Sequence, residues 1–490
     1  MILSIKSNLS IFLVCLSMQG CMNQAYYEEP INMTDVLDEI NSWSISNPDL
    51  NKFLKLNGVA SEVFQTNIFS IDRLFLTGIY YDPEMQRAYK KWKKSKIILD
   101  HSDYKINPEF FIPFEHHSDT SDGQSEWTIG VVLSFIYERK SKREARIAKE
   151  QVNLLNSSLE MYRLVLDRYG LFEEKYHAYA LRRAKISEIK NELIVLRDLF
   201  VHLQNKYELG AVSQFKLNSM KLELQRSLFQ LSLQENKLQE NKDELLTMTH
   251  LAQSELDMIK IEIINPLSFA EIAYQEMEII DSDLAELQKV MMNNNLDMAI
   301  KLNDYAQSEA DLRLEIEKQY PDLVLSPGFI FDQTDNLWSL GSSWVLPLFK
   351  NSQQDFNILK AIEERKIKQQ EVIVLQKEML NSLYQKYRSV VRHKSSIKIS
   401  DDIVESIEQR EKELEKQMEI GGIDLITIMR NKIEFYKARK ERIDVYKEAI
   451  HALLEFEHSL QSVYSKISIN GVVASWIKMI EERSKNELVN

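Results

Sequence analysis

The sequence predicts a mainly α-helical protein with a small β part, built from two similar halves that each form a long helical hairpin. Glycine and proline are scarce, with 12 and 9 copies in 490 residues, and no proline occurs in 114–265 or after position 347. Long helices can therefore run unbroken through both stretches, because an internal proline would kink or end them. Leucines also recur at every seventh position, which is typical of helices packed as coiled coils. They are Leu217, Leu224, Leu231, Leu238 and Leu245.

Segments of the first half recur 211 to 213 residues later in the second half. The matching pairs are Leu74–Ala88 with Leu287–Lys301, Asn107–Phe110 with Tyr320–Leu323, Trp127–Gly130 with Trp338–Gly341, and Gly210 with Gly421. Because four pairs share nearly one offset, the sequence predicts an internal duplication. We expect a first repeat over 74–282, a second over 283–465, and a C-terminal tail over 466–490.

The N-terminus has the features of a secretion signal. Residues 1–20 contain Lys6 followed by an apolar run from Leu9 to Leu16, which predicts a signal peptide. Cys21 follows Gly20 in a stretch that resembles a bacterial lipobox, so we expect Cys21 to be lipidated and 21–73 to be a lipid-anchored N-terminal segment. The alternative is a plain secretory signal with an incidental cysteine. Position 22 is Met rather than Asp, so the simplest signal for retention at the inner membrane is missing.

Each half is expected to contain the same elements in the same order. A first helix (74–102 or 283–319) leads into a pair of strands (about 107–136 or 321–349). A very long helix then reaches a glycine turn (about 207–214 or 418–425), and a second long helix returns. Glycine ends a helix readily, and Ser213 and Asp424 are suited to cap the helices that follow. The first long helix, about 138–206, would measure about 100 Å.

The four predicted strands alternate between large apolar and smaller side chains over about ten residues. This alternation is typical of strands in a membrane-spanning β-barrel, and the alternative is a soluble sheet covering a core. The residues expected to face lipid are Trp127, Ile129, Leu133, Phe135, Leu325, Phe329, Trp338, Leu340, Trp344 and Leu346. Four strands cannot close a barrel, since about eight is the usual minimum, so several copies of the chain would have to share one.

Taken together, these segments resemble the TolC family of outer membrane factors. The resemblance covers about 74–465 and is carried by Asp82-Pro83, the segment Tyr320–Gly328, Trp338–Gly341, Leu346–Phe349 and the two glycine turns. It implies a homotrimer with twelve strands in one outer membrane β-barrel and with the helices forming a periplasmic tunnel. It also implies contact with a periplasmic adaptor (a membrane fusion protein) and an inner-membrane pump of the RND or ABC type. Ser141–Ala148 is similar to a segment of the heavy-metal, CzcC-like branch, with Ser141 replacing a glycine.

The resemblance implies two kinds of site at the glycine turns. The residues expected to contact the adaptor are Gly210, Val212, Ser213, Gly421, Ile423 and Asp424. The alternative is that they only turn the chain. Relatives narrow the tunnel entrance with acidic residues just past the second glycine. Here Asp424, Thr427 and Arg430 occupy that region, and Asp424 could equally be only a helix cap.

Several functions are disfavoured by composition. The chain carries 61 basic and 74 acidic residues, and a net charge of −13 argues against nucleic-acid binding. The only cysteines are Cys15 and Cys21, so we expect no disulfide framework and no cysteine metal site in the body of the protein. No apolar run of 18 residues follows the N-terminus, so we expect no transmembrane helix there. His116 and His117, in a predicted loop near Asp119 and Asp122, could bind a metal but are better explained as exposed polar residues. No catalytic motif stands out, so we expect neither an enzyme nor a cofactor.

The leading hypothesis is a lipid-anchored outer membrane channel that passively conducts substrate from an adaptor and pump, with most of its mass in the periplasm. A lipid-anchored coiled-coil scaffold of the envelope, without channel activity, is the alternative from another class. A duct for type I protein secretion is a third possibility. The cargo, whether metal cation, drug or protein, stays open.

Overall fold

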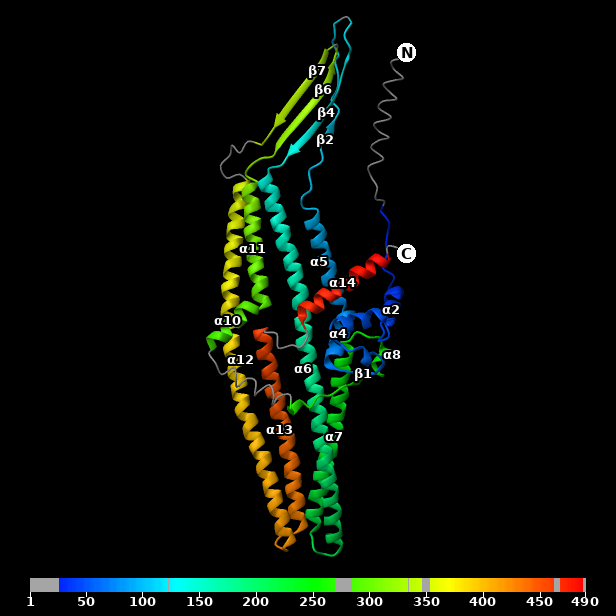
Figure 1. The fold of residues 1–490 in the computed structure, drawn as a ribbon, viewed down its shortest axis with the longest axis vertical. Coiled ribbons are helices and arrows are strands. Elements are labelled where there is room, and N and C mark those ends of the chain that lie inside the picture. The colour runs from blue at the N-terminus through cyan, green and yellow to red at the C-terminus, as the bar shows by residue number, and fades with distance from the viewer. Residues whose placement is uncertain are drawn as a thin grey trace.

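The computed structural model describes residues 26–121, 123–268, 284–333, 335–345, 353–461 and 468–487. The molecule is elongated, with a β-sheet at one end, the turns of two helical hairpins at the other, and small elements around the middle (Figure 1). The predicted class, mainly helical with a small β part, is confirmed. The predicted signal peptide, Cys21, Asp122 and Leu346 lie outside the described residues.

Two hairpins of very long helices form the body of the molecule. The first joins α6 (Lys140–Glu208, 69 residues) to α7 (Gln214–Thr247), and the second joins α12 (Gln353–Glu419, 67 residues) to α13 (Leu425–Leu460). Near the turns the helices lie side by side in the order α7–α6–α13–α12. An apolar cluster that includes Leu199, Met220 and Ile433 joins the two hairpins at that end.

The first helix of each half is broken into two, whereas the sequence led us to expect single helices over 74–102 and 283–319. The observed helices are α4 (Ile71–Tyr81), α5 (Pro83–Asp100), α10 (Leu284–Asn294) and α11 (Leu296–Glu317). At the first break Pro83 lacks the N–H that would continue the helix, and the Asp82 carboxylate caps α5 by accepting from the Glu84 N–H at 2.7 Å. Asn295 caps α11 in the same way, by accepting from the Met298 N–H at 2.9 Å.

The sheet at the top of Figure 1 is antiparallel. Its strands are β2 (Glu109–Phe111), β3 (Phe114–His116), β4 (Trp127–Tyr137), β6 (Leu323–Asp332) and β7 (Asp335–Ser343). Both β2 and β3 pair with β4, which pairs with β6, which pairs with β7. The edge formed by β2 and β3 and the edge formed by β7 therefore have no partner strand among the described residues.

The first predicted strand is interrupted at Pro113, which separates β2 from β3. Proline cannot donate to a ladder, although the Pro113 carbonyl still accepts from the Gly130 N–H at 3.0 Å. The prediction that His116 and His117 lie in a loop is wrong for His116, which ends β3 opposite Trp127. His117 continues the pairing by donating its backbone N–H to the Glu126 carbonyl at 2.8 Å.

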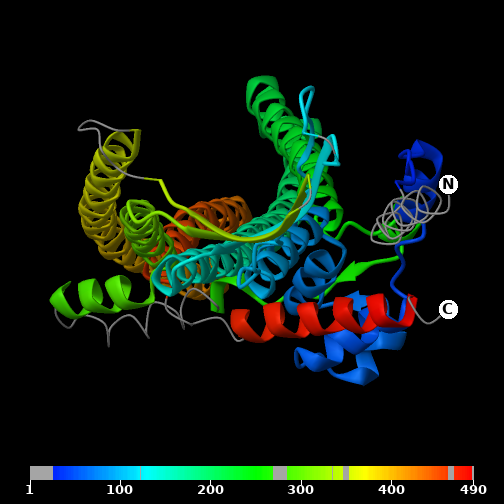
Figure 2. The ribbon, with the colours of Figure 1, turned by 90° about the horizontal axis from the view of Figure 1, so that it is seen from above.

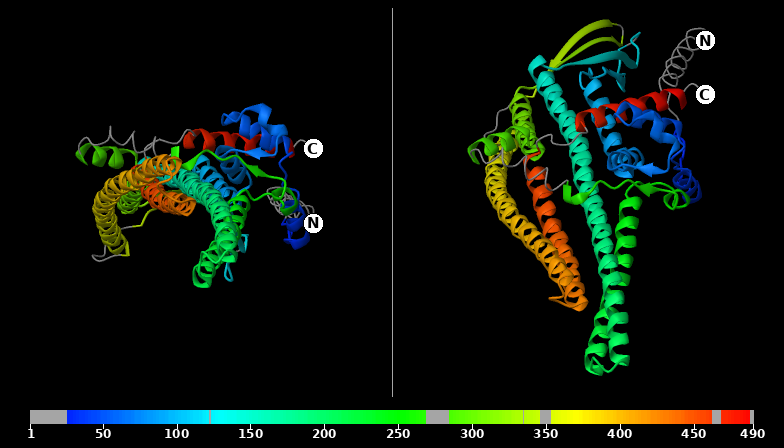
Figure 3. Two further views of the ribbon diagram at one scale, coloured as in Figure 1. Left: turned by 90° about the horizontal axis from the view of Figure 1, so that it is seen from below. Right: turned by 60° about the horizontal axis from the view of Figure 1, so that its bottom comes forward.

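Small elements from both ends of the chain pack around the middle of the long helices. They are α2 (Met33–Asn41), α3 (Pro48–Leu56), a 3-10 helix (Ser61–Gln65), β1 (Ile68–Phe69), α8 (Gln253–Leu256), β5 (Lys260–Ile261) and α14 (Ile469–Glu487). Strands β1 and β5 pair in parallel. The largest apolar cluster lies here and includes Phe53, Phe75, Phe172 and Trp476. In Figures 2 and 3 the long helices form a curved layer, with α14, α3 and α4 on its convex side.

Candidate functional site

The outward face of the sheet is apolar and exposed. The nine described residues predicted to face lipid, Trp127, Ile129, Leu133, Phe135, Leu325, Phe329, Trp338, Leu340 and Trp344, are between 36% and 83% exposed. The strand register places Val131, Phe329 and Trp338 opposite one another in one row, and Val131, absent from the predicted set, is 44% exposed. No core covers this face among the described residues.

The other face of the sheet is mixed, with small and polar side chains beside Val132, Ile136 and Ile330. Thr128 and Gly130 are buried, and Ser134 lies 2.9 Å from Ser326 between their hydroxyl oxygens. A side chain at Gly130 would collide with Ile330 at 2.8 Å, so glycine is required by the close approach of β4 and β6. The two faces of the sheet therefore differ: one is exposed, aromatic and apolar, and the other is mixed, with its small residues where β4 and β6 approach closely.

Aromatic residues mark both ends of the apolar face. Tyr104, Tyr137 and Tyr320, each at least half exposed, lie where the strands approach the helices. At the far end Phe114 stacks on Trp127, with ring centroids 4.8 Å apart. The eleven residues of β4 extend about 36 Å, which at a strand tilt of about 40° corresponds to a height of about 28 Å. This height is close to the ~25 Å apolar band, bordered by aromatic residues, of a transmembrane barrel.

The glycines at the opposite end make the hairpin turns. Gly210 and Gly421 have φ angles of +72° and +78°, which glycine adopts without the strain that a side chain would introduce. Ser213 caps α7 by accepting from the Lys216 N–H. Asp424 caps α13 by accepting from the Thr427 N–H at 3.1 Å and from the Thr427 hydroxyl at 2.8 Å.

The two turns lie next to each other. The ammonium of Lys206, in the last turn of α6, is 3.8 Å from the Asp424 carboxylate of the second hairpin. The hydrogen bonds from Thr427, with smaller contributions from nearby lysines, lower the pKa of Asp424 below its usual value. Asp424 and Thr427 are therefore brought together, while Arg430 is exposed one turn further along α13.

The predicted contact residues at the turns differ in exposure. Val212 and Ile423 are half-buried, and Val212 packs in the cluster that contains Leu217, four residues into α7. This packing is a hydrophobic staple, which fixes the angle at which the chain enters the helix. Gly210, Ser213, Gly421 and Asp424 are exposed. The apolar side chains directly before the two glycines, Leu209 and Ile420, are also presented to solvent, each 83% exposed. Neither Leu209 nor Ile420 was among the residues predicted from the sequence, although an apolar residue directly before each glycine was a readable signal.

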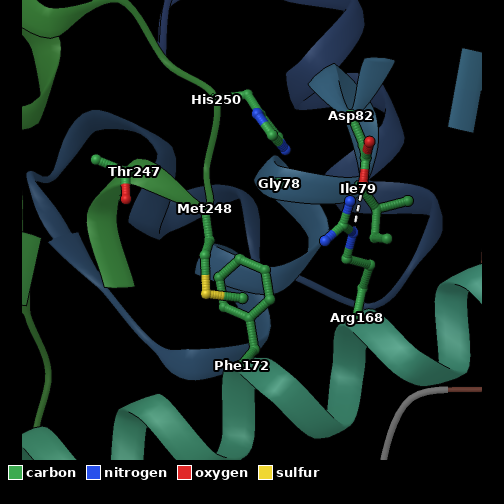
Figure 4. Close-up of a pocket in the computed structure, with 8 residues that line it drawn as sticks. All are labelled: Gly78, Ile79, Asp82, Arg168, Phe172, Thr247, Met248 and His250. Atoms are coloured by element: carbon green, nitrogen blue, oxygen red, sulfur yellow. Dashed lines mark hydrogen bonds and ion pairs between the residues drawn. The ribbon is translucent and has the colours of Figure 1, made fainter. Parts of the chain in front are cut away.

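A cavity of about 170 Å³ lies near the middle of the molecule, where α4, α5, α6 and the end of α7 meet. Figure 4 shows Asp82, Arg168 and His250 around it. Asp82 is buried, and its Oδ2 is 2.8 Å from Arg168 Nε. Burial lowers the pKa of His250, while Asp82 opposes this effect. The cavity belongs to the junction that holds the helix break at Asp82 against α6.

The predicted metal-binding candidates are engaged within the sheet. His117 Nε2 lies 2.9 Å from Thr128 Oγ1 and 3.7 Å from Asp332 Oδ1, and His116 Nε2 lies 3.7 Å from Glu126. Within the described ranges no three His, Cys, Asp or Glu side chains gather as they would to hold a metal ion. None of the described helices is both long enough and apolar enough to cross a membrane.

Solved structures of outer membrane channels share this architecture. VceC, an outer membrane protein from Vibrio cholerae, is 13% identical with a TM-score of 0.62, over 81% of this chain and 97% of that one. The CmeC outer membrane channel of Campylobacter jejuni is 10% identical with a TM-score of 0.59, over 94% and 98% of the two chains. CusC, which forms a transmembrane channel, is 10% identical with a TM-score of 0.61, over 90% and 99%.

The fold is therefore that of TolC-family outer membrane channels, in agreement with the resemblance of the sequence motifs. These neighbours are channel proteins rather than enzymes. No protein-family model matches the sequence, and no curated protein matches it either.

Proposed function

We propose that this protein is the outer membrane channel of a tripartite efflux system and conducts substrate passively from an adaptor and pump. One observation carries the proposal. A single chain joins a sheet with an exposed apolar face to helices of 69 and 67 residues, which extend about 100 Å away from it. A sheet of this kind suits a bilayer, and helices of this length suit a conduit through the periplasm.

We further propose that three copies close the channel. The unpaired N–H and C=O groups of the two sheet edges would otherwise promote aggregation. Pairing β7 of one copy with β2 and β3 of the next satisfies these groups and leaves no open edge. Counting β2 and β3 as the two parts of one interrupted strand, each copy supplies four strands and three copies supply twelve. A ring in which one edge of each subunit meets the opposite edge of the next is a closed heterologous assembly.

Exposed apolar residues on the outermost helices support the same assembly. Helices α7 and α12 lie at the two ends of the helical layer near the turns. Both carry large apolar side chains that are 48% to 66% exposed, namely Leu222 and Phe229 on α7 and Phe356, Leu359, Ile367, Ile399 and Ile403 on α12. Near the turns, contact of Ile399 and Ile403 of one copy with α7 of the next would remove apolar area from water, which is favourable. The other three residues of α12 lie nearer the sheet, where α5 of the next copy would cover them.

The two halves support the proposed duplication. Each has a helix capped by Asp82 or Asn295, a sheet segment, a long helix, a turn at a positive-φ glycine and a returning helix. We assign the turns, with Leu209 and Ile420 alongside the predicted Gly210, Val212, Ser213, Gly421, Ile423 and Asp424, to contact with a periplasmic adaptor. We place the entrance at Asp424, Thr427 and Arg430, the signal peptide at 1–20 and the lipid anchor at Cys21.

A charge placed on the apolar face of the sheet tests the channel directly. Leu133→Arg combined with Phe329→Arg should prevent assembly in the outer membrane, since each arginine facing lipid costs about 2–4 kcal/mol near the bilayer midplane. The measurement is the mass of the detergent-extracted protein from separated outer membranes, by light scattering. A trimer is expected for the unmodified chain, and little or none for the double variant.

The matched control places two arginines at Leu56 of α3 and Ile68 of β1, which are 51% and 50% exposed and far from both the sheet and α7. It should assemble normally. A normal yield of trimer from the double variant in the sheet would contradict the barrel and favour the envelope scaffold. An unmodified protein that forms trimers but conducts no ions in a planar bilayer would contradict the channel.

A further inference from the structure

Helix α5 carries a concentrated positive charge in a chain whose net charge is −13. We define the α5 cationic face as Arg87, Lys90, Lys91, Lys93 and Lys94, five cations within eight residues. Four of them are spaced three or four residues apart, so they form one stripe along the helix. All five are exposed.

The acidic groups near this face are too few to neutralise it. Arg87 pairs with Glu84, and Lys91 Nζ lies 3.6 Å from Glu160, in pairs that are all about half exposed or more. Exposed ion pairs of this kind contribute little free energy of interaction. Lys90, Lys93 and Lys94 have no carboxylate within 4 Å among the described residues, and like charges at this spacing destabilise a helix.

The orientation of the face is set by what packs behind it. Met85 and Tyr89 are buried on the side of α5 opposite the stripe of four cations, and the Tyr89 ring lies 5.5 Å from Trp476 of α14. Lys93, four residues after Tyr89, lies at the edge of this stripe. Helix α14 lies on the convex side of the helical layer (Figures 2 and 3). The α5 cationic face therefore points toward the concave side, which becomes the interior of the tunnel in the proposed trimer.

The α5 cationic face lies too far from the sheet to contact the lipid headgroups of the membrane. Ser95, directly after the face, bonds to Ser157 with 2.8 Å between the hydroxyl oxygens. Ser157 follows the start of α6 by 17 residues, which places this level about 26 Å below the sheet. The polar headgroup layer on each side of a bilayer is only about 5–8 Å thick, so the lysines lie well outside it.

A neighbouring copy does not remove the charge either. In the proposed ring, α12 of the next copy would lie beside α5 in the half nearer the sheet. The stretch of α12 at this level begins roughly 15 residues from the start of that helix and offers Glu371 and Glu378, together with Lys368 and Lys377. Glu371 already pairs with Lys368 at 3.0 Å. The acids and bases of this stretch balance, so a net positive charge stays on α5.

Resting on the channel function above, we propose that the α5 cationic face forms a positive ring inside the upper tunnel and favours anionic cargo. Rings of Arg and Lys side chains give pores a preference for anions. The effect is electrostatic and is exerted on freely diffusing solute, so it strengthens as salt is lowered, with a screening length of about 10 Å at 0.1 M and about 30 Å at 0.01 M.

The test compares the chloride-to-potassium permeability ratio of the full-length protein in planar bilayers, under a potassium chloride gradient. The variant is Lys90→Gln, Lys93→Gln and Lys94→Gln together. We expect the ratio to fall by roughly two-fold or more at about 0.01–0.1 M salt, with a larger fall at the lower salt. The matched control removes the same charge from the small elements around the middle, through Lys55→Gln, Lys260→Gln and Lys478→Gln, and should leave the ratio unchanged.

An unchanged ratio in the α5 variant would overturn the inference, as would an equal change in the control. A variant that no longer forms trimers by light scattering would also overturn it, because the lysines would then serve subunit contact. The absence of any current from the unmodified trimer would contradict the proposed channel itself. The two failures are therefore distinguishable.

Discussion

Glu173 on α6 illustrates how burial changes a single residue. Burial, opposed by a hydrogen bond with Tyr169 and assisted by the nearby charge of Asp72, raises the pKa of the Glu173 carboxyl to about 7. Folding therefore favours the protonated form of this acid. At a pH below about 4.5 the group is protonated in both states and imposes no penalty, and the penalty grows as the pH rises toward 7.

Glu173→Gln is accordingly expected to stabilise the protein at pH 8, by about 1–3 kcal/mol, and to leave it unchanged at pH 4.5. The melting temperature, followed by circular dichroism, measures the effect at both values. Glu174→Gln, at the exposed neighbouring position, serves as the control and should have no effect at either pH. A Glu173→Gln variant that is less stable at pH 8 would contradict this account.

At the scale of the elements, buried ion pairs between α6 and α13 help to join the two hairpins. Glu188 and Glu192 on α6 are buried, and they pair with Arg439 at 2.8 Å and Lys440 at 2.5 Å on α13. Removing one partner from such a pair leaves the other charge buried without compensation. The contact between the hairpins is therefore sensitive to the loss of a single lysine.

Lys440→Met should lower the free energy of unfolding by about 3 kcal/mol, because Glu192 would stay buried without the compensating charge of the lysine. Adding Glu192→Leu to Lys440→Met should recover most of this loss, because the unpaired charge is removed as well. Thermal unfolding of the two variants beside the unmodified protein gives the comparison. Equal stability of the single and double variants would show that Glu192 is not the origin of the cost.

The sequence predicts helices better than it predicts their interruptions. Heptad spacing identified the long arms because coiled-coil packing constrains every turn, and glycine followed by a capping residue marked both reversals. The breaks at Asp82 and Asn295 were missed because a capped restart needs only one local hydrogen bond and leaves the apolar pattern intact. The division at Pro113 was missed because β2 and β3 are only three residues each.

The candidate site was predicted in part for a similar reason. Alternation along the strands identified the exposed apolar face, since side-chain direction reverses at every residue. At the turns, residue type alone could not separate Val212, which staples α7 from within, from Leu209, which faces solvent. Whether a side chain faces the cluster or the solvent here depends on the direction of the chain on each side of Gly210.

At the scale of the whole molecule, the exposed turns predict where a partner binds. Leu209→Asp with Ile420→Asp should weaken association with a periplasmic adaptor and leave folding unchanged, since both side chains are 83% exposed. Proteins captured by a reversible cross-linker in intact cells, quantified by mass spectrometry, report the association. Ile194→Asp, exposed on α6 but about 22 Å along the helix from Leu209, is the control. Equal capture by both variants would argue against contact at the turns.

The two open edges of the sheet also have a consequence for the time course of biogenesis. The hairpins bring together helices that are close in sequence, so each can form as soon as it has been synthesised. In the proposed trimer, the sheet of a lone copy would complete the hydrogen bonding of its edges only after two encounters with other newly made chains. The rate of its maturation therefore depends steeply on how many chains are made at once, and at low expression the lone chain is exposed to proteolysis for longest.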